Sequence, residues 1–262
     1  MHLVPVKRKN VSATGSKPAP KGYHAHRERQ RRRILEAAER LFDERGIDRV
    51  TMAEITAASG VRASTVYQYF SNKDDIVWAI LGEVMETSSR LVMETTDGAA
   101  TGLAKISALL GFFADELARN AAKVRFLAQF DAMYARDWPV ERLLTLEAQF
   151  NPQGVHYFGT LIREGIADGS LRGDLDPDLT MQAVMNAVIG AQRRLASLGA
   201  KVELEYGQTT DRLFRETIRI LMLGLRGAPA DTDAAADIPG PAKTAERRPK
   251  ARQSKTKKRR TS

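Results

Sequence analysis

The segment from Val61 to Asp75, VRASTVYQYFSNKDD, concentrates side chains that can hydrogen-bond to phosphate oxygens and base edges. Arginine can bind guanine or phosphate through paired donors, and the hydroxyl groups of serine, threonine and tyrosine can reach phosphate. Small residues in a first helical turn also let a helix N-terminus approach a nucleic acid closely. The candidate DNA-contacting residues here and just before are Thr51, Arg62, Ala63, Ser64, Thr65, Tyr67, Gln68, Tyr69 and Lys73.

Three aromatic residues lie within four positions of this segment, and two interpretations compete for them. They are either a core cluster or partly a surface that faces a partner. Val61, Val66 and Phe70 are spaced to share the inward face of a helix, which leaves Tyr67 and Tyr69 on the rest of it. We therefore expect Phe70 to be core and both tyrosines to face phosphates.

The elements that must position this segment are short helices. From Arg29 onward, apolar residues recur at intervals of three and four until Gly46, which predicts one amphipathic helix. Thr51 and Glu54 have the spacing of a capping box, and Gly60 ends the short helix that they begin. A further helix follows almost at once, so residues 51–70 predict a helix-turn-helix.

A fourth helix is expected directly behind the third. Ser71 and Asn72 supply its cap, and two acidic residues in its first turn suit the positive end of the helix dipole. The apolar spacing continues as far as Leu91, and a polar break follows at 95–101. One long helix would thus link the helix-turn-helix to the rest of the chain. Lys73 at the start of this helix could reach the DNA backbone.

These residues resemble the DNA-binding domain of TetR-family transcriptional regulators. The run TMAEITAASGVRASTVYQYFSNKDDI keeps the family's spacing of the Gly-Val turn, Thr65, Tyr67, Phe70 and Lys73, over about residues 28–88. GSLRGDLDPDL is similar to the turn between the family's seventh and eighth helices. Thr56 and Ser59 stand where the family prefers alanine, Arg62 replaces its usual serine, and Ala63 stands where many members carry a base-reading polar side chain. We therefore expect Arg62, Thr65 and Tyr67 to carry most of the readout.

The resemblance implies an all-α fold, with an N-terminal three-helix domain that contains the helix-turn-helix and a C-terminal helical bundle for ligand binding and dimerisation. The apolar periodicity beyond residue 100 supports the bundle independently, because the helix around residues 103–117 carries apolar residues on two sides. Asp137 with Pro139, and Asp176 with Pro177, predict further helix starts, and the last helix is expected from about Tyr206. The expected divisions are a basic arm at 1–27, the DNA-binding domain at 28–75, the regulatory domain at 76–227 and a basic tail at 228–262.

Two groups of residues in the expected regulatory domain are candidates for function. Large side chains at helical spacing are either plain core or the lining of an effector pocket, namely Phe112, Phe126, Phe130, Tyr134, Trp138, Phe158 and Met185. Small residues near the C-terminus form a seam that permits close helix packing, and the last helix is apolar nearly all round. Because the family pairs these two helices across a dimer, the predicted interface is Ala183, Ala187, Gly190, Ala191, Phe214, Ile218 and Leu221.

The net charge of +9 belongs to the two ends of the chain. Residues 1–33 carry ten Lys/Arg and one acid, and residues 228–262 carry ten Lys/Arg and four acids. Both ends are poor in large apolar residues, so we expect disordered tails that remain solvated or add sequence-independent DNA affinity. No run is long and apolar enough for a membrane helix, no signal peptide is indicated, and cysteine is absent, so a cytoplasmic protein is expected.

No recognisable catalytic or cofactor motif occurs in the sequence. There is no nucleophile elbow, phosphate-binding glycine loop or H-E-x-x-H pattern, and His156 has no second ligand at metal-binding spacing. We therefore expect no enzyme, cofactor or metal. The predicted function is a homodimeric DNA-binding regulator, released as a repressor from a palindromic operator by a hydrophobic small molecule. The alternative is a general DNA-compacting protein that acts through its basic tails.

Overall fold

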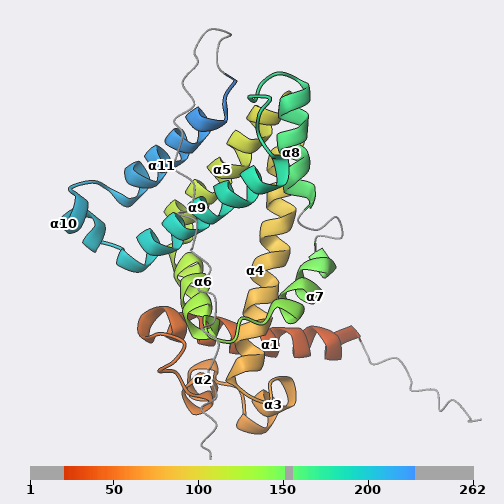
Figure 1. Cartoon of the computed structure of the whole chain (residues 1–262). Helices are drawn as coiled ribbons and strands as arrows, with labels where there is room; N and C mark the ends of the chain where they lie inside the picture. The colour runs from red at the N-terminus through yellow and green to blue at the C-terminus, as the bar shows by residue number, and fades with distance from the viewer. Residues whose placement is uncertain (1–20, 151–155, 228–262) are drawn as a thin grey trace, which may run out of the picture. The chain divides into compact units, whose positions relative to one another are not determined.

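The computed structural model describes residues 21–150 and 156–227, and within these ranges the chain is built from eleven α-helices (Figure 1). The helices are α1 (Lys21–Arg45), α2 (Met52–Ser59), α3 (Ala63–Tyr69), α4 (Lys73–Thr96), α5 (Gly102–Arg119), α6 (Ala121–Tyr134), α7 (Val140–Phe150), α8 (His156–Ala167), α9 (Pro177–Leu198), α10 (Lys201–Tyr206) and α11 (Thr210–Leu225). None of the described helices is long and apolar enough to cross a membrane.

Helices α2 and α3 form the predicted helix-turn-helix on α1. Thr51 is the N-cap of α2, and both hydrogen bonds of its capping box with Glu54 are present, as predicted. Gly60 ends α2 in the left-handed conformation with φ of 61°, which favours glycine. Helix α1 begins at Lys21, so residues 21–27, which we assigned to the arm, are helical.

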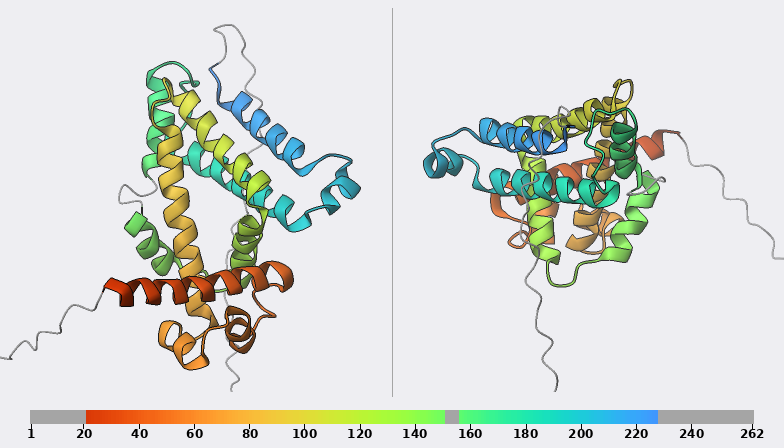
Figure 2. Two further views of the ribbon diagram at one scale, coloured as in Figure 1. Left: turned by 180° about the vertical axis from the view of Figure 1, so that it is seen from behind. Right: turned by 45° about the horizontal axis from the view of Figure 1, so that its top comes forward.

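Helix α4 begins inside the DNA-binding part and extends into the bundle, as the views in Figures 1 and 2 show. Asn72 caps it, with its side chain accepting from the Asp75 amide at 2.9 Å. The helix ends at Thr96, within the expected polar break. The expected domain boundary at residues 75 and 76 therefore falls within one continuous helix.

The described residues contain two hydrophobic cores. One joins α1, α2 and α3 to the first half of α4 and to α6, where Phe126 and Phe130 are both buried. The other lies around α5, which packs against α4, α6, α8, α9 and α11. The two apolar sides predicted for this helix agree with its central place, and Ile106, Leu109 and Leu110 on it are fully buried.

The C-terminal part differs from expectation in two places. The last helix begins at Thr210, because Tyr206 ends the short helix α10 and Gly207 follows in the left-handed conformation with φ of 64°. Phe214 was predicted at a dimer interface, but it is fully buried within its own chain among the bundle residues. It is therefore not available to a partner.

The rest of the predicted interface keeps some exposure. Ala183, Ala187 and Gly190 are exposed along α9, and Ala191, Ile218 and Leu221 are partly buried. On α11, Ile220 and Leu223 are exposed large hydrophobic residues that the sequence prediction omitted. The apolar surface of α11 is thus divided between Phe214, which faces inward, and these two, which face outward.

Phe214→Ala is expected to lower the free energy of unfolding by about 3–5 kcal/mol, because it leaves a cavity in a packed core. Leu204→Ala is the matched control, since Leu204 is 89% exposed, and it should change the unfolding free energy by no more than about 0.5 kcal/mol. Urea denaturation of both variants measures the difference. Equal, small effects would contradict the buried position of Phe214.

Candidate functional site

The exposed face of α3 carries most of the residues predicted to contact DNA. Arg62, Ala63, Ser64, Tyr67 and Gln68 are exposed, and Thr65 is half-buried. Phe70 is buried and Tyr67 is 53% exposed, so the predicted division between these two aromatics is confirmed. The surface offers a guanidinium, hydroxyl groups and an amide at the start of a short helix, which suits contacts with a DNA groove.

Tyr69 lies differently from the prediction. It is half-buried, and its hydroxyl donates to the Arg27 carbonyl oxygen at 3.1 Å, with Gln30 Oε1 at 3.4 Å. The Arg27 guanidinium lies over its ring at 5.4 Å from the centroid. The phenol therefore ties α3 to α1 in this structure, and its expected direction toward a phosphate is wrong for this conformation.

Lys73 also has a partner within the chain. Its Nζ donates to the Ile47 carbonyl at 2.7 Å and to the Asp48 carbonyl at 3.3 Å. These carbonyls follow α1 and have no helical partner of their own to accept from, so the ammonium fixes the loop that leads to α2. Its contact with the DNA backbone stays a prediction.

Thr51 is exposed, and it lies next to the Glu54 carboxylate, which has two partners. The Glu54 carboxylate accepts from the Thr51 amide at 2.8 Å and contacts Arg45 at 2.8 Å. The backbone hydrogen bond from Thr51, followed by that from Arg45, lowers the pKa of Glu54 to about 2. The helix cap is therefore complete above the ordinary carboxylate pKa of about 4.3 and is lost as pH falls towards 2.

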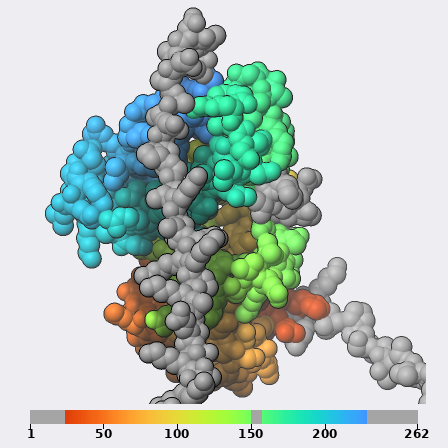
Figure 3. All heavy atoms as spheres, viewed as in Figure 1, coloured from red at the N-terminus to blue at the C-terminus, as the bar shows by residue number. Residues whose placement is uncertain are grey.

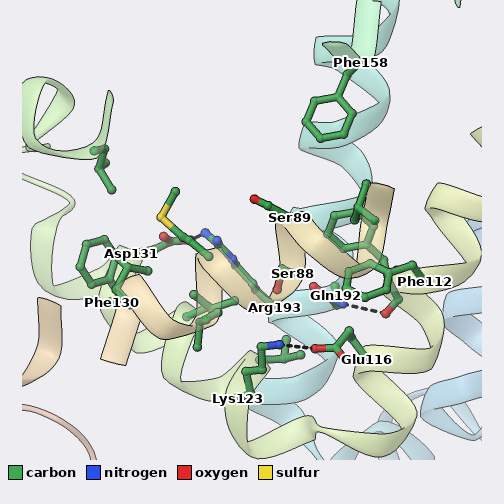
Figure 4. Close-up of a pocket in the computed structure, with 18 of the residues that line it drawn as sticks. Ser88, Ser89, Phe112, Glu116, Lys123, Phe130, Asp131, Phe158, Gln192 and Arg193 are labelled. Carbon is green, nitrogen blue, oxygen red and sulfur yellow. Dashed lines mark hydrogen bonds and ion pairs between the residues drawn. The ribbon is translucent and has the colours of Figure 1, made fainter. Parts of the chain in front are cut away.

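A cavity of about 520 Å³ lies between α4, α5, α6, α8 and α9, and its walls are mostly apolar (Figure 4). Of the predicted pocket residues, Phe112, Phe130, Trp138 and Phe158 line it. The other three do not, because Phe126 stacks on Phe42, Tyr134 bonds to residues of α4, and Met185 packs against the bundle core.

The sequence prediction missed the contribution of α4 to this cavity. Seven residues of α4 line it, namely Leu81, Val84, Met85, Ser88, Ser89, Val92 and Met93. Their alternating steps of three and one are those of one helix face, so the signal was present in the sequence. The prediction considered aromatic residues and Met185, and it did not consider the aliphatic and serine side chains of α4.

Charged and amide groups occupy one side of the cavity. Lys123 Nζ lies 2.6 Å from the Glu116 carboxylate, and Gln192 Nε2 donates to the Phe113 carbonyl at 2.7 Å. Arg193 contacts the Asp131 carboxylate through Nη1. Burial lowers the pKa of Arg193 to about 10, which still leaves it protonated at neutral pH.

Helix α6 faces this cavity on one side and the DNA-binding helices on the other. Towards α1, Arg125 makes a two-pronged contact with Asp43 at 2.7 and 2.9 Å. Gln129 accepts from the Ile47 amide at 2.9 Å and donates to the Phe42 carbonyl at 3.2 Å. Towards the cavity, the same helix presents Val124, Leu127, Phe130 and Asp131.

A second connection runs from the end of α6 to the first turns of α4. The Tyr134 hydroxyl donates to Asp74 and accepts from Trp78 Nε1 at 3.0 Å. Arg142 of α7 lies over the Trp78 ring at 3.9 Å and contacts Asp74 at 3.3 Å. Burial, then the bond to Asp74, raises the pKa of Tyr134 to about 12, so this contribution is complete below about pH 10 and is lost as pH rises through 12.

The exposed face of α3 and a partly open, mostly apolar cavity, with α4 and α6 bordering the cavity and the DNA-binding core, define a helix-turn-helix DNA-binding protein with a helical bundle that contains a pocket. Residues 34–80 match the sequence model of the family described as bacterial regulatory proteins, tetR family. The repressor KstR2 of Mycolicibacterium smegmatis is 24% identical over 155 residues, which cover 59% of this chain and 74% of KstR2. The regulator TtgR of Pseudomonas putida is 43% identical over 61 residues, covering 23% of this chain and 29% of TtgR.

Solved structures of the same fold extend over most of the described chain. FadR of Bacillus subtilis, whose structure is a complex with stearoyl-CoA, superposes with a TM-score of 0.55 at 21% identity, covering 74% of this chain and 99% of FadR. Residues 34–80 of the chain thus match the DNA-binding region of the tetR family, and the fold of the rest is similar to that of solved TetR/AcrR regulators. Among the described residues, no cluster of side chains suited to a metal ion occurs, and His156 is outside the residues whose side chains are described.

Tyr67→Phe is expected to weaken binding to the operator about threefold to tenfold, because it removes one hydrogen bond to a phosphate. Tyr69→Phe is the control, since its hydroxyl already bonds within the chain, and it should affect thermal stability more than DNA affinity. Titration of a palindrome selected from random duplexes gives both affinities. A loss with Tyr69→Phe and none with Tyr67→Phe would reverse the assignment.

Proposed function

We propose that the chain is a homodimeric, sequence-specific transcriptional repressor that leaves its operator when a largely apolar ligand enters the cavity. The observation that carries this proposal is that α4 and α6 each line the cavity and also contact the DNA-binding helices. A change at the cavity can therefore reach α3 through α1, because α3, α4 and α6 all pack against α1.

The proposed DNA contact places α3 in a major groove. Arg62 and Gln68 are the exposed side chains on α3 best suited to base edges, while Tyr67, Ser64 and Thr51 contact phosphates. The small side chain of Ala63 lets α3 approach the DNA closely, but it cannot hydrogen-bond to a base. The sequence specificity of one copy is thus modest, which favours two copies of the chain on one operator.

The proposed dimer uses the exposed faces of α9 and α11. Ala183, Ala187 and Gly190 provide a surface on which a second backbone can approach closely, and Ile220 and Leu223 provide apolar area beside it. A two-fold axis there would present two α3 helices to successive major grooves, about 34–36 Å apart. A palindromic operator follows from that symmetry.

The proposed switch is a difference in ligand affinity between two arrangements of α4 and α6. A ligand that contacts Met85 and Ser89 on α4 and Leu127 on α6 binds better when these helices move apart. The contacts of Arg125 and Gln129 carry that movement to α1. The stearoyl-CoA complex of FadR, which has a similar fold, supports a ligand with a large apolar part.

We assign the protein no catalytic step, and we place it in the cytoplasm, where a repressor of this kind meets its operator. The alternative function, DNA compaction through the basic ends, depends on residues 1–20 and 228–262, which lie outside the described residues. The surface of α3 favours the repressor, because a compacting protein needs no dedicated helix-turn-helix.

At physiological salt the full chain is expected to prefer its selected palindrome over random duplexes by at least about a thousandfold. Removal of residues 228–262 should weaken binding to both duplexes by a similar factor, because those basic residues provide counterion release without sequence reading. Competition titrations at two salt concentrations measure the preference. Equal affinity for all duplexes would instead support the compacting function.

The double variant Asp43→Asn/Arg125→Met should separate ligand binding from operator release, because it removes the charged contact between α1 and α6 without leaving one charge unpaired. Nile red, a neutral apolar dye, is expected to bind variant and wild type alike. It should lower operator affinity about tenfold in the wild type and less than about twofold in the variant.

Fluorescence titration and operator binding on the same samples test this coupling. Arg90→Gln is the matched control, since Arg90 is exposed on α4 and pairs only locally with Glu94. Undiminished release by the double variant would show that the contact between α1 and α6 does not carry the signal.

A further inference from the structure

The apolar inner face of α9 contains one polar residue. The buried residues along this helix are Met181, Val184, Val188, Gln192, Leu195 and Ala196, so Gln192 stands in a stripe that is otherwise apolar. It is only 4% exposed, and it lines the cavity described above. Because burying an amide costs free energy unless its polar atoms are hydrogen-bonded, the partners of its two ends matter.

One end of the Gln192 amide is fixed by the main chain of α5. Nε2 donates to the Phe113 carbonyl oxygen at 2.7 Å, and Figure 4 draws this bond. A carbonyl oxygen can only accept, so the amide cannot turn over without placing two acceptors against each other. The orientation of the amide is therefore decided by α5, and Oε1 points away from Phe113.

The other end, Oε1 of Gln192, is an acceptor without a hydrogen-bond partner in the part of the chain that the structure describes. It is also not among the described buried polar atoms that are closed off from solvent without a partner. Oε1 therefore keeps accessible surface. Since the residue is 4% exposed and lines the cavity, that surface opens into the cavity, where a bound molecule can reach it.

Other polar groups of the lining are already paired or can adapt. Glu116 and Asp131 each contact a cation that also lines the cavity. The hydroxyls of Ser88 and Ser89 can rotate either to donate or to accept. Gln192 Oε1 differs because it can only accept. A ligand that displaces water from the cavity and brings no donor leaves this oxygen buried and unpaired, which lowers affinity about tenfold or more.

We propose that the effector is a largely apolar molecule that carries a hydrogen-bond donor for Gln192 Oε1. This inference rests on the proposed role of the cavity as the effector site. The apolar part of the ligand packs against residues such as Phe112 and Phe158, and the donor fixes its orientation relative to α9. Alcohols, phenols and compounds with an N–H group share this chemistry, whereas hydrocarbons, ethers and esters do not.

Five naphthalenes substituted at the same ring position test the proposal on the full chain by equilibrium dialysis. Naphthol and aminonaphthalene carry an O–H and an N–H donor, and methylnaphthalene has the same size without one. Methoxynaphthalene and ethylnaphthalene form a second matched pair, in which the oxygen can only accept. Each affinity is divided by the partition coefficient of that compound from water into cyclohexane, which removes the cost of dehydrating its polar group.

In the wild type, the normalised affinities of naphthol and aminonaphthalene should each exceed that of methylnaphthalene at least about tenfold. Methoxynaphthalene should exceed ethylnaphthalene by about threefold or less, because an ether cannot pair with Oε1. In Gln192→Met the naphthol excess should fall about tenfold, because the side chain keeps its length and loses its acceptor.

Gln182→Met is the matched control, because Gln182 is exposed on the same helix and does not line the cavity. It should leave all five normalised affinities unchanged. The comparison of the five compounds on the wild type does not depend on either variant, so it decides the proposal even if Gln192→Met does not fold.

The proposal is overturned if naphthol shows no excess over methylnaphthalene in the wild type, if the ether pair shows as large an excess, if a folded Gln192→Met keeps the wild-type excess, or if none of the compounds binds. Operator binding by the ligand-free protein, measured on the same preparation, separates this from the proposed function. Sequence-specific operator binding that persists would leave the DNA-binding role intact, and its loss would count against the repressor itself.

Discussion

The structure depends on the burial of α6 against the DNA-binding helices. The core of α1, α2 and α3 does not close on itself, because α4 and α6 supply part of it. Phe126 and Phe130 of α6, together with Ile76 and Ile80 of α4, complete that core. Figure 3 shows only the outer surface, with the DNA-binding helices in red and orange below the bundle. The DNA-binding helices α1 to α3 therefore share one hydrophobic core with α4 and α6. The same packing that stabilises it also exposes it to changes at the cavity.

Local chemistry allowed much of the fold to be predicted. The capping box of Thr51 and Glu54, the Asn72 cap and the Asp176–Pro177 helix start are decided by neighbouring residues, and each is present. Periodicity shows which face of a helix is apolar, but not which neighbour will cover it. Phe126 and Phe214 were for this reason assigned to a pocket and to an interface, whereas both lie in cores within the chain.

The two polar side chains that differed from expectation show a related limit. Tyr69 and Lys73 are residue types that often contact DNA. In this structure Tyr69 donates to a carbonyl oxygen 42 residues away, and Lys73 donates to one 26 residues away. A backbone carbonyl oxygen has two lone pairs, so it can compete with an outside partner for a nearby side-chain donor. That competition depends on the approach of α1 to α3 and α4, which only the assembled fold reveals.

The chain has two tryptophans, and their positions give it a pair of built-in optical reporters. Trp138 lines the cavity, while Trp78 lies beneath Arg142 and beside Tyr134, near the start of α4. The fluorescence of Trp138 should respond to a ligand in the cavity. The fluorescence of Trp78 should respond to changes in the contacts of α4 with Tyr134 and Arg142. Two variants, each with one tryptophan replaced by phenylalanine, would let ligand arrival and structural response be timed separately in one molecule.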